Sequence, residues 1–312
     1  ILNDRSNLQV DDTSVDETDS DGVPLLQASA TIIDYKTGQV KVLIGGRGNQ
    51  PPTSLNRAYF DLKSIGSTTK PLTVYGPAID TKLITAGTPL DDTSVSDEIL
   101  KKYNFGSVVP KNANGSMAGY VTAREALTYS KNLTSIKTVD MLGLDTALDY
   151  GEKSGLKYAS ESHTMSALAL GQFEQPIGNR DGGNTTILAS AYGAFGNNGV
   201  RYEPILYTRV EDASGNVLLE KEPETINLFS PQTSYIIYDI LKGSSSSAEF
   251  SDIPVAGKTG TTNSSDNFWF AGLTPYYSGS VWIGYDNPKR MSGKSSSAAS
   301  LFGKIMAVAH ED

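Results

Sequence analysis

The sequence has no cysteine among its 312 residues and only two histidines. Without cysteine it has no disulfide framework, no thiolate metal site and no cysteine nucleophile. A Ser-His-Asp triad or a histidine metal cluster would need His163 or His310, which lie far apart and outside any nucleophile-activating motif. We therefore expect no metal and no cofactor, and chemistry that rests on hydroxyls, amines and amides.

The chain also has no excess of positive charge and no long apolar run. It carries 26 Lys and Arg against 35 Asp and Glu, a net charge of −9 that repels phosphate backbones, so we expect no nucleic-acid partner. No stretch is long and apolar enough to cross a membrane. The first residues do not resemble a signal peptide or an initiator sequence. We expect an excised piece, with any membrane anchor upstream of Ile1.

Composition divides the chain into a short N-terminal segment and one large domain. Residues 1–22 include the acidic run "VDDTSVDETDSDG", which has few large apolar residues, and predict a flexible, solvated linker. The remaining residues, 23–312, predict one folded domain.

The pattern within that domain predicts an α/β fold of the α+β kind. β-Branched and alternating segments at 27–46 and 253–286 predict the strands of one five-stranded antiparallel sheet. Helical spacing dominates 65–250, which predicts an all-helical lobe apart from a small hairpin across Ser214-Gly215-Asn216. Residues 295–310 predict a closing helix on the sheet. A cleft is expected where lobe meets sheet. Two smaller expectations are a mobile serine loop at 244–247, and positions in the core or in a wall for Trp269 and Phe270.

The stretch "SIGSTTKP" contains a Ser-x-x-Lys pair, Ser67 and Lys70, where a loop enters a helix. Free backbone N–H groups and the helix dipole favour negative charge there, and Pro71 is tolerated in a first turn. Burial and a second cation would lower the pKa of Lys70 enough for it to act as a base. A second pair, Ser154 and Lys157, follows a helix C-terminus, where the dipole opposes an oxyanion, so we assign it to surface structure.

Two further motifs supply what a hydroxyl nucleophile needs. In "SKN", Ser130 can relay a proton and Asn132 can hydrogen-bond a substrate amide.

In "KTGTT", Lys258, Thr259 and Thr261 can bind a carboxylate, and Gly260 permits close approach of a ligand backbone. The backbone N–H groups of Ser67 and Thr261 could form an oxyanion hole.

Each short motif has a second copy in the chain, "KTG" at 36–38 and "SDN" at 265–267, and both fit turns or loops. Order and setting therefore carry more weight than the motifs taken singly. Longer segments narrow the match: the region from Gln27 to His310 resembles the transpeptidase domain of class A (bifunctional) penicillin-binding proteins. The segments that carry the resemblance are "ASATIIDYKTGQVKVLIGG", "LNRAYFDLKSIGSTTKP", "LALGQFEQP", "ASAYGAFGNNGVRYEP" and "GKTGTTNSSDNFWFAGLTP".

The resemblance implies a serine β-lactamase/D,D-transpeptidase-like fold and an extracytoplasmic enzyme at the bacterial cell surface. Ser67 would attack the penultimate D-Ala of a D-Ala-D-Ala stem peptide, Lys70 would take its proton, and Ser130 would relay a proton to the leaving amine near Lys258. An amine of a neighbouring peptidoglycan stem would then accept the acyl group, and β-lactam antibiotics would trap Ser67. A glycosyltransferase domain and a membrane anchor would lie upstream.

The sequence departs from the family pattern at "LKSIG" before Ser67 and at Leu133-Thr134 after "SKN". Both departures bear on cleft walls more than on catalytic groups. Three alternatives stay open: a D,D-carboxypeptidase, in which water replaces the amine acceptor, a β-lactamase, and a non-enzymatic β-lactam sensor. The β-lactamase is disfavoured because no "ExxLN" pattern follows Asn132. The sensor is disfavoured because the residues that activity needs are intact, namely Lys70, Ser130, Asn132 and Lys258.

Overall fold

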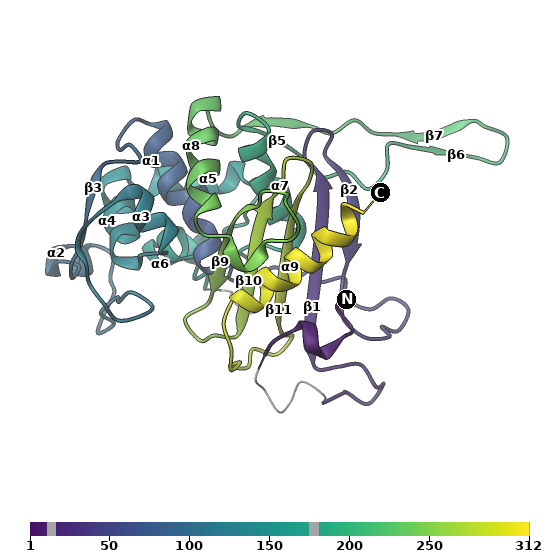
Figure 1. Cartoon of the computed structure of the whole chain (residues 1–312), viewed down its shortest axis with the longest axis horizontal. Coiled ribbons are helices and arrows are strands. Elements are labelled where there is room, and N and C mark those ends of the chain that lie inside the picture. The colour runs from purple at the N-terminus through teal and green to yellow at the C-terminus, as the bar shows by residue number, and fades with distance from the viewer. Residues whose placement is uncertain (11–16, 175–180, 312) are drawn as a thin grey trace.

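The computed structural model describes residues 1–10, 17–174 and 181–311, and its centre is a five-stranded antiparallel sheet (Figure 1). The strand order is β2-β1-β11-β10-β9, so β9 with its Lys-Thr-Gly motif is an edge strand. The predicted sheet of two N-terminal and three C-terminal strands is confirmed. The strands are β1 (Leu26–Asp34), β2 (Gln39–Ile44), β9 (Ala256–Thr261), β10 (Asn267–Leu273) and β11 (Ser278–Tyr285).

Helices pack on both faces of the sheet. Alternate side chains of each strand point to opposite sides, so each face contributes its own set of buried residues. On β10, Phe268 and Phe270 face the closing helix α9 (Ser296–Ala309), whose Phe302 ring lies 4.8 Å from that of Phe270. Trp269 belongs to the core on the opposite face, where α7 (Thr185–Gly196) packs, and its burial confirms the prediction. Helix α7 is apolar on nearly every side, which suits a helix held between sheet and lobe.

The second part of the molecule is a lobe built from helices, but it is not all helical as predicted. Three two-stranded sheets interrupt it, and the β6–β7 hairpin projects from the body (Figure 1). The β6–β7 hairpin confirms the one expected across Ser214-Gly215-Asn216. The strands of the other two pairs are three or four residues long and leave too little alternation in the sequence to be recognised. The helices are α1 (Gly76–Asp80), α2 (Asp97–Lys102), α3 (Ala123–Thr128), α4 (Asn132–Leu142), α5 (Leu144–Lys153), α6 (Met165–Leu170) and α8 (Pro231–Lys242). The paired strands are β3 (Pro89–Asp92) with β4 (Gly119–Thr122), β5 (Val200–Tyr202) with β8 (Thr225–Asn227), and β6 (Arg209–Glu211) with β7 (Val217–Glu220).

The prediction of a flexible linker over residues 1–22 is wrong for its first ten residues. Leu2, Leu8 and Val10 are buried in the same core as α9, and Ser297 Oγ donates to the Gln9 carbonyl over 2.8 Å. The burial of three apolar side chains offsets the entropy lost when the segment is ordered. Residues 11–16 of the predicted linker lie outside the described residues.

The serine run at 244–247 is also ordered, contrary to the expectation of a mobile loop. Ser244 Oγ donates to the Gly257 carbonyl over 2.6 Å, and Ser245 Oγ donates to the Val255 carbonyl over 2.7 Å. A short 3₁₀ helix at Ser246–Ala248 follows. These hydroxyls tie α8 to β9, so the serines are structural.

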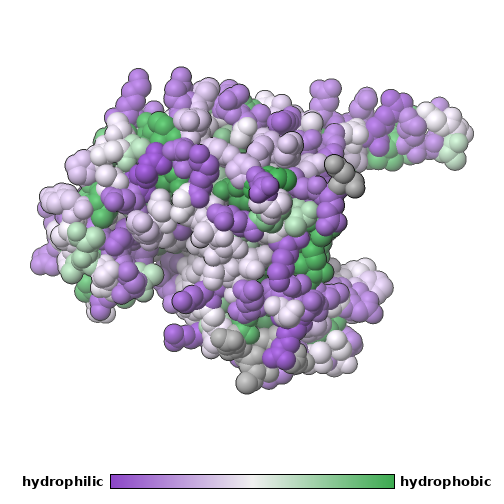
Figure 2. Space-filling view, viewed as in Figure 1, coloured by the Kyte–Doolittle hydropathy of each residue, from purple (hydrophilic) through white to green (hydrophobic). Residues whose placement is uncertain are grey.

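The face seen in Figure 2 is mostly hydrophilic, as the net charge of −9 leads one to expect. None of the described helices is long and apolar enough to cross a membrane.

Candidate active site

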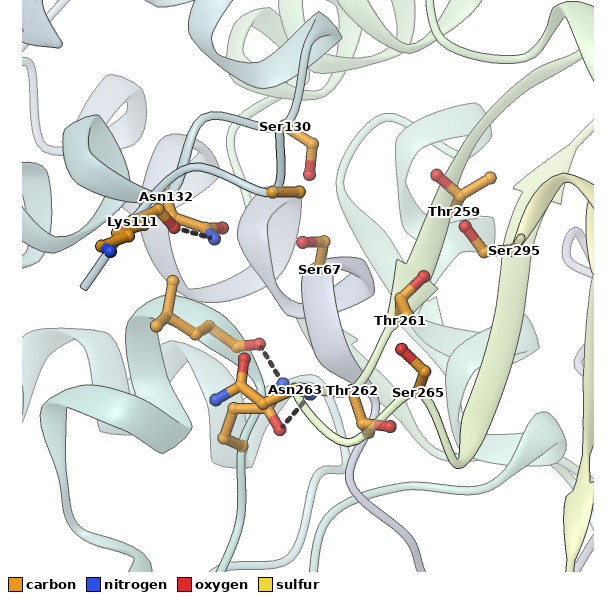
Figure 3. A pocket seen from close by; sticks show the side chains of 13 residues that line it. Ser67, Lys111, Ser130, Asn132, Thr259, Thr261, Thr262, Asn263, Ser265 and Ser295 are labelled. Carbon is orange, nitrogen blue, oxygen red and sulfur yellow. Dashed lines mark hydrogen bonds between the residues drawn. The ribbon is translucent and has the colours of Figure 1, made fainter. Parts of the chain in front are cut away.

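A cavity of about 400 Å³ opens between the lobe and the edge strand β9, where the sequence predicts a cleft. Residues of all three motifs line it, and Figure 3 shows Ser67 and Ser130 facing one another across its centre. From the motifs, the lining includes Ser67, Ser130, Asn132, Thr259 and Thr261. The fold therefore brings together segments that are nearly 200 residues apart in the sequence.

Ser67 lies in a 3₁₀ helix, Gly66–Thr69, at the start of a helical segment, as predicted. The segment continues as a single π-helical turn that begins at Pro71 and leads into α1. The Lys70 N–H donates to the Ser67 carbonyl, so the two residues lie one helical turn apart. Among the described residues, no hydrogen bond ties Ser67 Oγ to a neighbour, which leaves the hydroxyl directed into the cavity (Figure 3).

Lys70 is fully buried, and its amine sits against the loop that carries the second motif. Its Nζ lies 2.7 Å from Asn132 Oδ1 and 2.8 Å from the Ser130 carbonyl. Ser130 Oγ and the Lys131 carbonyl are each 3.3 Å away. Burial, with a smaller contribution from the Lys258 cation, holds the pKa of Lys70 well below its usual value. The lowered pKa favours the neutral amine, which is the form that can accept a proton.

Asn132 and Ser130 occupy the junction between α3 and α4. Helix α3 opens with a capping box, in which Thr122 and Glu125 bond reciprocally. Ser130 follows the helix with a φ of +56°, a left-handed conformation that is uncommon for residues other than glycine. The Asn132 amide donates to the Lys111 carbonyl over 2.8 Å while its oxygen meets Lys70, so in this structure the side chain is held by protein groups.

Strand β9 places its residues on two sides. Alternation puts Thr259 and Thr261 on one face and Lys258 and Gly260 on the other, toward the lobe. Lys258 is buried behind the cavity wall, and burial lowers its pKa to about 7. Its Nζ donates to the Thr259 carbonyl over 3.2 Å.

The N–H of Thr261 points to the open edge of the sheet. The neighbouring Thr262 N–H donates to the Asn267 carbonyl of β10, and such ladder bonds alternate along an antiparallel pair. Gly66 lies directly against this edge: a Cβ there would sit 2.8 Å from Thr261 N. The backbones at Ser67 and Thr261 are therefore neighbours, as two donors of an oxyanion hole must be.

Gly260 has a different role in packing from the one predicted. The space a Cβ would fill is occupied by the Ile65 carbonyl and by Thr68 Cγ2, at 2.9 Å. The backbone that comes close is thus that of the Ser67 segment itself. Glycine at 260 and at 66 lets β9 lie against the 3₁₀ helix.

The second copies of the motifs are structural, with one exception. Ser154 caps α5, and its Oγ donates to the Tyr150 carbonyl over 2.8 Å. The prediction of a surface position for Ser154 is wrong, because the residue is buried. Gly38 is a turn residue with φ of +73°. Ser265, from the "SDN" copy, lines the cavity.

Sequence reasoning missed several residues around the cavity. Lys111 and Gln172 line it, and Gln172 Oε1 accepts from the Asn263 N–H over 3.2 Å. Asp92 and Asn112 are buried behind the Ser130 loop. Their segments have no periodicity that would mark a buried polar residue. In the described part of the chain, no cluster of three or more His, Cys, Asp or Glu could hold a metal ion.

Comparisons with known proteins agree with this geometry. Residues 28–307 match the family described as "Penicillin binding protein transpeptidase domain". Penicillin-binding protein 1A of Clostridium perfringens is 53% identical over 319 residues, which cover 100% of this chain and 47% of that protein. This chain therefore spans about half the length of that relative.

Solved structures share the fold at low sequence identity. The 1A protein of Haemophilus influenzae superposes with a TM-score of 0.74 at 20% identity, covering 93% of this chain and 48% of that one. PonA1 of Mycobacterium tuberculosis, solved with penicillin V, superposes with a TM-score of 0.72 at 20% identity, covering 96% and 82%. The chain belongs to the penicillin-binding protein transpeptidase family, and the resemblance to its class A members is confirmed.

Proposed function

We propose that this domain is a D,D-transpeptidase that crosslinks peptidoglycan stem peptides through an acyl-enzyme on Ser67. One observation carries the proposal most strongly. A buried lysine with a lowered pKa, Lys70, lies one helical turn from a cavity-facing serine hydroxyl and in contact with Ser130 and Asn132. This arrangement supports the roles of nucleophile for Ser67, base for Lys70 and relay for Ser130.

In the proposed acylation, Ser67 Oγ attacks the carbonyl carbon of the penultimate D-Ala. Its proton passes to Lys70, and the oxyanion is held by the N–H groups of Ser67 and Thr261. The peptide bond to the terminal D-Ala breaks, and Ser130 hands a proton to the departing amine. The 3.3 Å contact of Lys70 with Ser130 Oγ supports this route, because it lets the lysine reprotonate Ser130.

The remaining residues of the third motif would bind the substrate. Thr259 and Thr261 line the cavity and would hold the terminal carboxylate, with Lys258 charged behind them. Asn132 would turn its amide from Lys111 toward the peptide. In the second half of the reaction an amine of a neighbouring stem attacks the ester, Ser67 recovers its proton, and a new peptide bond forms. β-Lactams are proposed to enter the same cavity as mimics of D-Ala-D-Ala.

The test is to supply a stem-peptide donor with and without an amine acceptor and to follow products by mass spectrometry. The proposal predicts a crosslinked product only when the amine is present. Exclusive hydrolysis of the donor under both conditions would identify a carboxypeptidase instead. Rapid turnover of penicillin without a long-lived adduct would identify a β-lactamase. Absence of any reaction, together with stable penicillin binding, would identify a sensor.

The chain covers only part of its relatives, so we also propose its setting in the whole protein. A membrane anchor and a glycosyltransferase domain would precede it, and the domain would work outside the cytoplasm at the cell surface. Protease added to intact protoplasts tests this: degradation of the domain in the full-length protein is expected. Full protection, with degradation only after lysis, would contradict it.

A further inference from the structure

Behind the Ser130 loop lies a buried ion pair that the reaction scheme above does not use. Lys131 Nζ is 2.8 Å from Asp92 Oδ2, and the Asp92 side chain is fully shielded from solvent. The same carboxylate accepts from Asn112 Nδ2 over 2.7 Å and from the Ala118 N–H over 3.0 Å. Asp92 is fixed at the end of β3, where it pairs with Gly119 of β4. The carboxylate is therefore held by three donors on a rigid ribbon.

Asn112 links this carboxylate to the active-site loop. Its Oδ1 accepts from the Asn132 N–H over 2.8 Å and from the Leu133 N–H over 3.3 Å. These are N–H groups of the first turn of α4, which have no partner within the helix. Asn112 thus serves as the cap that α4 lacks from its own sequence, since Lys131 at that position gives no side-chain cap. The start of α4 is positioned from outside the helix.

The loop needs such support because of what it holds. Ser130 adopts a φ of +56°, which costs a residue with a side chain roughly 1 kcal/mol or more and persists only where the surroundings enforce it. Two of the four contacts of the Lys70 amine are loop carbonyls, those of Ser130 and Lys131. A shift of the loop would move the base and the relay hydroxyl together.

We propose that Asp92 is a positioning residue, which acts through Asn112 and Lys131 to hold Lys70 and Ser130 in their reactive arrangement. The inference rests on the proposed function, because it assigns Lys70 and Ser130 the roles given above. Asp92 touches neither the cavity nor the reacting atoms.

The charges around Lys70 give the proposal a distinctive signature. Lys258 faces the amine from β9, the Lys131–Asp92 pair lies behind the loop, and Tyr75 of the π-helical turn lies near Asp92 with its pKa raised to about 12, so it is neutral. Replacing Asp92 with Asn leaves the Lys131 cation uncompensated, which disfavours protonation of Lys70. Replacing Lys131 with Gln leaves the Asp92 anion without its cation, and this negative charge favours protonation of Lys70.

The experiment measures the second-order rate constant for acylation by a fluorescent penicillin against pH, in the wild type and in Asp92→Asn, Lys131→Gln and Asp91→Asn. Asp91 is the matched control: it is the preceding residue of β3, makes a 2.8 Å pair with Lys137, and is partly exposed on the other side of the strand. Labelling stoichiometry counts the folded sites, so that loss of protein is separated from loss of rate.

We expect Asp92→Asn to acylate about 10- to 100-fold more slowly per active site, as a displaced base requires. The acid limb of its pH profile should move to lower pH, that of Lys131→Gln should move to higher pH, and Asp91→Asn should match the wild type. Unchanged rates and limbs in both network variants would overturn the inference, as would a lower stoichiometry with a normal profile in the surviving sites. If Asp92→Asn does not fold, the test rests on Lys131→Gln: a move of its acid limb to higher pH would support the inference, and no move or a move to lower pH would overturn it. A wild type that does not acylate at Ser67 would instead refute the proposed function.

Discussion

Replacing Gly260 with alanine tests whether the edge of β9 must lie against the Ser67 segment. An alanine Cβ would lie 2.9 Å from Thr68 Cγ2 and 3.1 Å from Trp269 Cβ, and closer still to the Ile65 carbonyl oxygen. Carbon atoms in contact prefer about 3.5 Å or more, so the strand must retreat by at least about 0.6 Å. Trp269 is buried in the core and the Ile65 carbonyl belongs to the backbone, so neither can yield as a flexible side chain would.

That retreat carries Thr261 N–H away from Ser67 N–H. Loss of one oxyanion donor, or a misplacement approaching 1 Å, lowers a rate by about 10²-fold, which is about 2.7 kcal/mol of transition-state stabilisation. We expect Gly260→Ala to be acylated by a fluorescent penicillin about 100-fold more slowly in stopped-flow measurements. Gly87→Ala is the control, because a Cβ there meets nothing within 4 Å. Acylation of Gly260→Ala within about threefold of the wild type would show that the close contact of β9 with the Ser67 segment is not needed for acylation.

Three further predictions concern charge and packing. Burial lowers the pKa of Lys258 to about 7, so its cation is lost as pH rises through that value and the rate of acylation should fall at alkaline pH. The arginine of Lys258→Arg does not titrate in that range, so the alkaline limb of its pH–rate profile should move to higher pH. Ser245→Ala removes the donor to the buried Val255 carbonyl and should cost about 1–2 kcal/mol in urea unfolding, whereas no change would show that the serine run does not hold β9. Leu8→Ala should cost about 2–5 kcal/mol, while the exposed control Leu25→Ala costs under about 0.5, and equal values would restore the flexible-linker interpretation.

The sheet was predictable because its strands are long enough to show alternation and because its edge strand β9 carries the Lys-Thr-Gly motif. In the lobe, the β6–β7 hairpin was predictable from the turn residues between its strands. The β3–β4 and β5–β8 pairs were not, since strands of three or four residues do not establish a period. The N-terminal segment was misjudged for a related reason: its acidic residues dominate the composition, while Leu2 and Leu8 decide its packing. Apolar residues spaced far apart in a polar segment give no periodic signal.

The candidate site divides in the same way. Ser67, Lys70 and Ser130 could be proposed as site residues because the chemistry demands those residue types at short spacing, and helix polarity favoured Ser67 over Ser154. The network of Asp92 and Asn112 could not be found, because its members are joined only by long-range contacts of the folded chain. The serines at 244 and 245 were expected to be mobile because a low-complexity sequence does not reveal which backbone carbonyls its hydroxyls will bond, here those of Gly257 and Val255.

Peptide mapping of the protein after reaction with penicillin shows directly whether Ser67 is the nucleophile. We expect one covalent adduct, located on Ser67 and absent from Ser67→Ala, with a lifetime long enough for isolation. An adduct on any other residue, or undiminished labelling of Ser67→Ala, would contradict the assignment of Ser67 as the nucleophile.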